Sequence, residues 1–354
     1  MDKELDDVIY GISRYNNSSG VVCYMNSIIA ILQQTPIFAD YILTAQFRDK
    51  LLDKHENTLD IKDSILFQLY NLLNISHMYD NYKINPDTFR DTVSKKENMW
   101  GKHQHQDSQE FLTFLLNNVE EELAEKVMFI PGRQIELIKE KPMHLEDDLI
   151  NIMANDCWQK YIKNEFSIIK NLFGGLSHVV ITCNYCGNKS HNFDLFQILQ
   201  LSIPDNATNI HDCLEEFSKE EKMDIHNMIK CNFCGRLNKS TKQTKLFKLP
   251  KILIIQLKRF RVNNYGIINQ KINKKIKYPI DLEINNNNYK LFGVNNHHSI
   301  GHFNSINFGH YTSNVINRFD NKWYTFDDAK PIVELDESDI ISNNAYMLFY
   351  YKND

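Results

Sequence analysis

Three residues that could form a nucleophilic centre occur in order along the chain. Cys23 lies in the stretch CYMNS, at the start of a segment with helical periodicity. His310 lies in GHY, and Asp327 follows the aromatic run WYTF. A thiolate can attack a carbonyl carbon, an imidazole can transfer protons, and a carboxylate can fix the orientation of that imidazole. This order predicts acyl transfer by a thiol, provided that folding brings the two ends of the chain together.

The position of Cys23 suggests how its thiol could be activated. Taken alone, a cysteine is more often a buried apolar side chain than a nucleophile. At a helix N-terminus, however, unpaired N–H groups and the helix dipole would lower the pKa of Cys23. The same N–H groups could bind the oxyanion of a tetrahedral intermediate. We therefore expect Cys23 in the first helical turn, with a lowered pKa.

Two C-x-x-C pairs, each followed by glycine, lie between these candidates, in CNYCG and CNFCG. Four thiolates make a closed tetrahedral site that leaves no position for water, so the spacing predicts one structural Zn²⁺ ion. Two unmetallated turns or a redox pair are the alternative, which the matched glycines disfavour. The predicted ligands are Cys183, Cys186, Cys231 and Cys234.

Composition narrows the class of protein. The chain has 354 residues, is 42% hydrophobic, and carries a net charge of −5. Its acidic N-terminus is unlike a secretory signal, and no apolar run is long enough to cross a bilayer. These features predict a soluble intracellular protein of the cytoplasm or nucleus, with neither membrane nor nucleic acid as a partner. A zinc-ribbon nucleic-acid module is the weaker reading, because the basic residues of the middle region are typical of a solvated face.

The pattern of elements predicts an α+β fold. Apolar residues recur at helical spacing after Cys23 and again after Asp107, whose acidic side chain is suited to cap the second helix. From about residue 177 the sequence pattern becomes that of short strands, and residues 252–257 are typical of a central buried strand. The split of the candidate catalytic residues between the two ends favours one interlocked domain over residues 1–354.

Seven short motifs closely resemble those of the ubiquitin-specific proteases, in the same order. This resemblance implies a papain-like cysteine protease fold with a helical thumb, a palm built on a central β-sheet, and zinc-bearing β fingers. The expected boundaries are approximately 1–175 for thumb and palm entry, 176–248 for fingers and 249–354 for palm. The motifs are GVVCYMNS, QDSQEFL, LFGG with CNYCG, LQLSIP, LPKILIIQLKRF, GHY with WYTFDD, and AYMLFY.

The resemblance also implies roles for individual residues. Cys23 would be the nucleophile, His310 the base and Asp327 its orienting carboxylate, with Asp328 as a lesser candidate. Cleavage would follow the C-terminal glycine of ubiquitin, so the expected partners are ubiquitin and ubiquitinated proteins, and the enzyme is expected to be a monomer. The tail of ubiquitin would be held by Asp107, its channel lined by Tyr311, and the site supported by Gln106.

Neighbouring histidines compete with His310 for the role of base. GHF at His302 imitates GHY, and His297 and His298 are also close. A strand-like segment leading to the aromatic run follows only His310, which favours it over the others.

One position departs from the family pattern. The family carries an asparagine five residues before the cysteine as an oxyanion donor, and this chain has Ser18 there. An insertion in this segment would let Asn17 or Asn16 take the place of that donor. Losing one oxyanion donor costs about 10²–10³ in rate. We expect an active enzyme, and a ubiquitin-binding pseudoprotease with an impaired oxyanion hole is the alternative.

Overall fold

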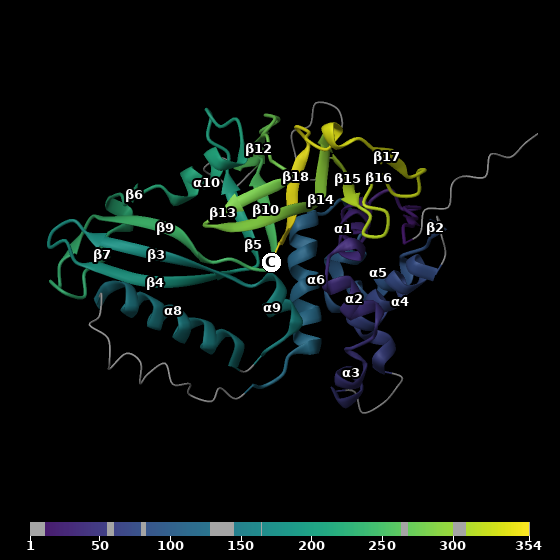
Figure 1. Ribbon diagram of the computed structural model, residues 1–354, viewed down its shortest axis with the longest axis horizontal. Helices are drawn as coiled ribbons and strands as arrows, with labels where there is room; N and C mark the ends of the chain where they lie inside the picture. Colours follow the sequence, from purple (N-terminus) through teal and green to yellow (C-terminus); the bar gives the residue numbers. More distant parts are fainter. Residues whose placement is uncertain are drawn as a thin grey trace, which may run out of the picture.

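The computed structural model describes residues 11–54, 60–78, 83–127, 145–163, 165–262, 268–299 and 309–353. Helices dominate up to residue 173 and strands dominate afterwards, which confirms the predicted α+β class. The helices gather on one side of a large sheet, and a second sheet projects away from both (Figure 1). We call these three parts the thumb, the palm and the fingers.

Helix α1 (Cys23–Gln34) runs through the middle of the molecule and is buried on every side. A helix that is apolar around most of its circumference must be enclosed, and α1 packs between palm strands and helix α6 (Ser108–Leu123). Asp107 caps the N-terminus of α6: its carboxylate accepts a hydrogen bond from the backbone N–H of Gln109 at 2.6 Å, as its sequence predicted. The other helical elements before the fingers are α2 (Phe38–Leu43), α3 (Arg48–Lys54), η1 (Asp60–Asp63), α4 (Ile65–Met78), α5 (Asp87–Lys96), η2 (Asn98–Gly101), α8 (Leu145–Lys163) and α9 (Ile168–Phe173).

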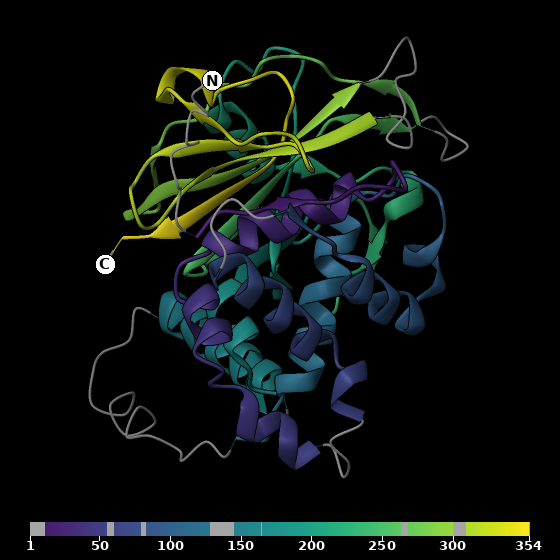
Figure 2. The ribbon, with the colours of Figure 1, turned by 90° about the vertical axis from the view of Figure 1, so that its right-hand side faces the viewer.

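The palm is a sheet with strand order β17-β16-β15-β14-β18-β10-β5, to which β13 adds by pairing with β14. Its centre is apolar because β10 is buried over Ile252–Leu257, the run predicted from sequence. Figure 2 shows this sheet lying across the tops of the thumb helices. Its strands are β5 (Ile198–Ser202), β10 (Ile252–Lys258), β13 (Asp281–Ile284), β14 (Asn287–Ser299), β15 (Gly309–Ile316), β16 (Trp323–Phe326), β17 (Val333–Leu335) and β18 (Ala345–Lys352).

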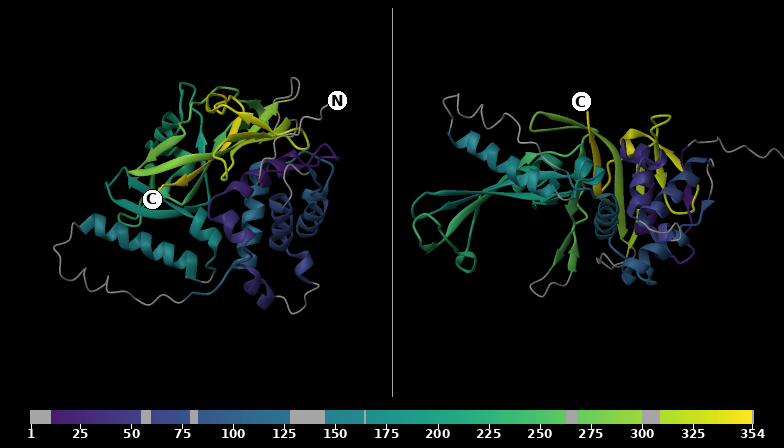
Figure 3. Two further views of the ribbon diagram at one scale, coloured as in Figure 1. Left: turned by 45° about the vertical axis from the view of Figure 1, so that its right-hand side comes forward. Right: turned by 90° about the horizontal axis from the view of Figure 1, so that it is seen from below.

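The fingers are a sheet with strand order β4-β3-β9-β6, and α8 lies along it (Figures 1 and 3). The predicted finger boundaries need one correction. Strand β5 and helix α10 (Ile210–Ser218) fall inside 176–248, yet β5 pairs in parallel with palm strand β10. The chain therefore leaves the fingers, enters the palm and returns. The finger strands are β3 (Gly175–Cys183), β4 (Lys189–Phe196), β6 (Glu221–Lys222) and β9 (Ser240–Lys248), and the hairpin β7 (Ile229–Lys230) with β8 (Leu237–Asn238) extends them.

Smaller elements complete the architecture. Strands β1 (Arg14–Tyr15) and β2 (Lys83–Ile84) pair in parallel beside the thumb, and β11 (Phe260–Val262) pairs with β12 (Ile268–Lys271) next to the palm. Short helical turns η3 (Ile225–Asn227) and η4 (Glu337–Asp339) lie in connections. Among the described residues, no helix is both long enough and apolar enough to cross a bilayer.

Candidate active site

The fold brings Cys23 to the strand that carries His310. Cys23 is the first residue of α1, and α1 packs against β15, which begins at Gly309. The thiol hydrogen-bonds to the backbone of Tyr311, the residue next to His310. A helix from the start of the chain and a strand from its end therefore meet at the predicted nucleophile.

His310 and Asp327 form a close pair, with His310 Nε2 at 2.6 Å from Asp327 Oδ1. Burial opposes ionisation of Asp327, but hydrogen bonds from Lys330 and His310 hold the pKa of this carboxyl below its usual range. The Lys330 Nζ donates to Asp327 Oδ2 at 2.7 Å. Because an ionised carboxylate can only accept, His310 carries its hydrogen on Nε2, and Nδ1 is left as the basic nitrogen.

Gly309 is required by the close approach of a neighbouring ring. A Cβ at this position would lie 2.1 Å from Nε2 of His297 and 2.8 Å from the backbone oxygen of His298. A side chain here would force the start of β15, and with it His310, away from strand β14. Glycine therefore lets β15 lie tightly against β14.

The prediction that the helix N-terminus lowers the pKa of Cys23 is wrong for this conformation. Burial raises the pKa of the Cys23 thiol to about 12, and the nearby charge of Asp328 acts in the same direction. Backbone N–H groups of Tyr311, Tyr24 and Cys23 itself lower the pKa, as the sequence argument anticipated, but burial outweighs them. With only 1% of its surface exposed, Cys23 is a thiol here and needs a base to become a nucleophile.

Asp328 joins three segments of the site. Its two carboxylate oxygens accept hydrogen bonds from the side-chain amides of Asn17 and Asn26, each at 2.8 Å. Its own backbone oxygen accepts from the N–H of Tyr15 at 3.0 Å. Asp328 thus fastens the loop before α1 to α1 itself, while the bond to His310 belongs to Asp327.

The structure distinguishes Ser18 from Asn16 and Asn17, the three candidates for the oxyanion donor. Asn17 is half-buried, and its Oδ1 accepts a hydrogen bond from the backbone N–H of Val22 at 3.2 Å. Together with His310, Asp328 and Lys330, Asn17 lines a cavity of about 460 Å³. Asn16 also lines this cavity, whereas Ser18 is exposed and lies outside its lining. The sequence offset therefore places an asparagine, and not Ser18, beside the His310–Asp327 pair.

The residues expected to hold a substrate tail lie at the base of α6. The Tyr346 hydroxyl donates to Asp107 Oδ2 at 2.7 Å and accepts from the Gln256 amide, also at 2.7 Å. Burial raises the pKa of Asp107 to about 6. Tyr311 is buried beside this group, where burial and the charge of Asp107 raise its pKa. Gln106 donates to the backbone oxygen of Met99 at 3.3 Å and so fastens the segment that precedes α6.

The rival histidines have other surroundings. His297 is fully buried and packs edge-on against the ring of Tyr311, with centroids 4.8 Å apart. His298 lies on the opposite face of β14, and its Nε2 is 2.8 Å from the Thr312 hydroxyl. His302 lies outside the described residues. Of the described candidates, His310 is the one whose ring contacts Asp327.

The four cysteines of the C-x-x-C pairs converge at the tips of the fingers. Their sulfur atoms all lie within 4.8 Å of one another, with Cys183 to Cys234 at 4.0 Å and Cys186 to Cys231 at 3.7 Å. A tetrahedral site with metal–sulfur bonds of about 2.3 Å requires sulfur atoms about 3.8 Å apart, so the tetrad fits a metal ion.

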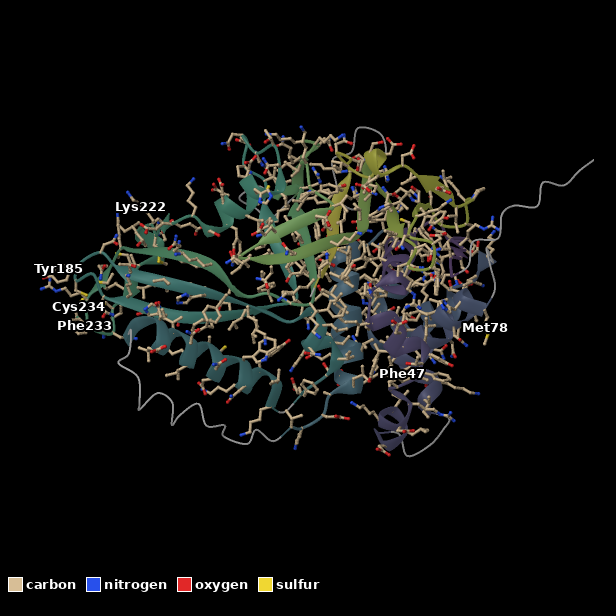
Figure 4. The ribbon with its side chains drawn as sticks, in the orientation of Figure 1. Phe47, Met78, Tyr185, Lys222, Phe233 and Cys234 are labelled. Carbon is tan, nitrogen blue, oxygen red and sulfur yellow. The ribbon has the colours of Figure 1, made fainter. Side chains whose placement is uncertain are left out.

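The two turns that carry these cysteines are built alike. Each closes with a glycine at positive φ, 73° for Gly187 and 71° for Gly235, whose N–H donates to the first cysteine's backbone oxygen. Each also exposes its middle aromatic residue, Tyr185 or Phe233. Figure 4 shows both rings and Cys234 at the end of the fingers far from thumb residues Phe47 and Met78.

Known proteins resemble this chain over almost its full length. It is 29% identical over 347 residues to "Ubiquitin carboxyl-terminal hydrolase Usp2" of Drosophila melanogaster, covering 94% of this chain and 34% of that protein. It is 28% identical over 381 residues to "Ubiquitin carboxyl-terminal hydrolase 4" of Saccharomyces cerevisiae, covering 98% of this chain and 39% of that protein. The rat "Ubiquitin carboxyl-terminal hydrolase 21" is 25% identical, with 94% and 60% covered. The chain thus spans about a third to three fifths of the length of these relatives.

Solved structures share the fold. The SAGA Ubp8/Sgf11/Sus1/Sgf73 DUB module bound to ubiquitin aldehyde contains a chain that matches with a TM-score of 0.72 at 21% identity, covering 97% of this chain and 70% of that one. The yeast SAGA DUB module with an Sgf73 mutant matches with a TM-score of 0.73 at 22% identity, covering 100% and 71%. These likenesses establish the papain-like α+β architecture with thumb, palm and fingers.

The family model described as "Ubiquitin carboxyl-terminal hydrolase" matches residues 15–350. The matched range includes every catalytic and metal-binding candidate named above. The chain belongs to the ubiquitin carboxyl-terminal hydrolase family.

Proposed function

We propose that this chain is a thiol-dependent deubiquitinase that hydrolyses the bond after the C-terminal glycine of ubiquitin. The observation that carries the proposal is the meeting of α1 and β15, which sets the Cys23 thiol against the backbone beside the His310–Asp327 pair. The relatives named above as ubiquitin carboxyl-terminal hydrolases support the same activity. Ubiquitin and ubiquitinated proteins are the proposed partners, and a monomeric enzyme of the cytoplasm or nucleus remains our prediction.

The proposed reaction has two stages. His310 Nδ1 removes the Cys23 proton as sulfur attacks the carbonyl carbon of the terminal glycine, and the resulting imidazolium gives that proton to the leaving amine. The C–N bond breaks and a thioester remains. Water, losing a proton to His310, then attacks the thioester, the C–S bond breaks, and the thiol is restored. Asp327 holds the ring throughout and stabilises its charge.

The oxyanion formed at each stage needs donors. Backbone N–H groups at the start of α1 are directed toward the Cys23 sulfur, and Asn17 lines the adjoining cavity. We propose Asn17 as the side-chain donor, because its Nδ2 has a second hydrogen beyond the one bonded to Asp328. Ser18, which is exposed, is the weaker candidate.

The extended tail of ubiquitin would approach past Asp107 and Tyr311. The Asp107 carboxylate is partly desolvated, so it would accept hydrogen bonds from tail N–H groups more strongly than an exposed one. Tyr311 would line the channel, and Gln106 would support it through its bond to Met99.

The cysteine tetrad would hold one structural Zn²⁺ ion. Four thiolates match the preferred ligand set of zinc, and they complete its coordination without an open position for chemistry. Its place at the finger tips, away from Cys23, supports a role in shaping the fingers.

A ubiquitin with a C-terminal fluorogenic amide tests the proposal. The wild type should release the fluorophore, and a ubiquitin bearing a C-terminal electrophile should label Cys23. His310→Ala should abolish turnover, and His302→Ala should not; the opposite pattern would move the base to His302. Binding of ubiquitin without labelling or turnover would identify the chain as a pseudoprotease instead.

A further inference from the structure

We propose that His298 is a positioning residue for His310. Its imidazole is neutral, is hydrogen-bonded to Thr312, and lies beside the His310 ring as a polar neighbour that is held in place. The inference rests on the proposed function for its assay, but its geometry is independent of the substrate. His298 was considered above only as a rival base.

Strand register sets the two rings side by side. His298 and His310 are direct partners in the antiparallel ladder of β14 and β15, so their side chains emerge on the same face. Thr312 lies two residues after His310 and shares that face. The 2.8 Å contact between His298 Nε2 and the Thr312 hydroxyl therefore ties the two strands together beside the catalytic histidine.

Both rings border one open hollow on the face of the sheet. A cavity of about 330 Å³ is bordered by His298, His310 and Asp327 together. It lies on the far side of the palm sheet from α1, because alternate residues of β15, such as Tyr311, pack toward the thumb. The hollow therefore places His298 beside the His310–Asp327 pair. Its other lining residues are Asn296, Thr312, Asn314, Thr325, Leu335, Asp339, Ser342 and Asn344.

The charges around His298 favour its neutral form. Burial lowers its pKa, and His310 on β15, Lys271 on β12 and Lys330 after β16 act in the same direction, against Asp327. Asp339 in η4 is the remaining charged group on the cavity wall. Lys271 is almost fully buried and bonds to both chain neighbours of His298: its Nζ donates to the backbone oxygen of His297 at 2.6 Å and to the Ser299 hydroxyl at 3.0 Å.

Neutrality at this position has a consequence for turnover. His310 gains a positive charge each time it removes a proton, and a second cation across the ladder would oppose that step. Because the His298 ring bonded to Thr312 is neutral, it does not oppose this charge, and Asp327 stabilises the His310 imidazolium. Charge at position 298 should therefore tune the basicity of His310, and its sign should decide the direction.

The test compares His298→Gln with His298→Glu, which have nearly the same shape and differ in charge. We measure the pH dependence of kcat/KM for the ubiquitin amide and of Cys23 alkylation by iodoacetamide, which needs no ubiquitin. His298→Glu should move the acid limb of both profiles to higher pH by about one unit, which is roughly a tenfold change in rate at a given pH on that limb. His298→Gln should leave it within about 0.3 pH units of the wild type, and His298→Lys should move it downward.

Controls separate positioning from folding. Thr312→Val should lower kcat about three- to tenfold without changing KM, as expected for loss of one hydrogen bond, and Thr312→Ser should restore it. His211→Gln, on the exposed surface of α10, should match the wild type. Coincident acid limbs for the Glu and Gln variants would overturn the proposal. If Cys23 of the wild type is alkylated normally but the protein never cleaves ubiquitin amide, the proposed function fails. The pH profiles of alkylation then still test the role proposed for His298.

Discussion

Asp107→Asn should raise the free energy of unfolding and lower kcat/KM for ubiquitin amide. Burial raises the pKa of Asp107 to about 6, against about 3.9 for an unperturbed carboxyl, so the folded state holds the charged form at a disadvantage. Asparagine keeps the helix cap through Oδ1, and its Nδ2 can donate to the Tyr346 hydroxyl, but it never ionises. The variant removes the penalty of the charge and leaves the packing in place.

The sign and size of this effect follow from linkage. Because the pKa is higher in the folded than in the unfolded chain, the wild type loses stability as pH rises from about 4 to 6. The advantage of Asp107→Asn should therefore grow from about 1 kcal/mol at pH 4.5 to about 3 kcal/mol at pH 7.5. Urea unfolding at the two pH values measures it. Asp224→Asn, at an exposed cap of η3, provides the matched control.

Turnover should change in the opposite direction. Losing the carboxylate removes charge-assisted hydrogen bonds to the tail of ubiquitin, each worth about 1.5–3 kcal/mol. The kcat/KM for ubiquitin amide should fall about 10- to 100-fold, mainly through KM. Equal destabilisation of Asp107→Asn at both pH values, or unchanged kcat/KM, would refute this account of Asp107.

Three further results are expected. Asn17→Ala should lower kcat about 10²–10³-fold if it donates to the oxyanion, with Ser18→Ala close to wild type; equal kcat for all three proteins would leave backbone N–H groups as the donors. Gly309→Ala should destabilise by about 1–3 kcal/mol and lower kcat, because its Cβ would strike His297; an unchanged melting temperature and kcat would show that β14 yields freely. Metal analysis should find one zinc per chain, and a chelator should raise KM before kcat falls; metal-free active protein would contradict the tetrad assignment.

The sequence predicted what depends on periodicity and motif. The helices after Cys23 and Asp107 and the buried strand over 252–257 follow from apolar spacing, and the structure contains all three. The cysteine tetrad was predicted equally well, because ligand spacing and glycines are local features.

Features that depend on three-dimensional neighbours were missed. The pKa of Cys23 is decided by how deeply α1 is enclosed, which helical position alone does not reveal. The bonds from Asn17 and Asn26 to Asp328 join residues about three hundred positions apart, and no spacing rule connects them. Strand β5 enters the palm by parallel pairing with β10, and its short apolar run gave no indication of its partner.

The place of β18 in the palm determines when the palm sheet can be completed during synthesis. This strand, Ala345–Lys352, lies between β14 and β10 at the middle of the sheet, although it follows every other strand in the chain. A ribosome that has not yet released residue 352 carries a palm with an open seam, and Tyr346 cannot yet meet Asp107. The proposed protease activity should therefore arise only after β18 has been made and has inserted between β14 and β10.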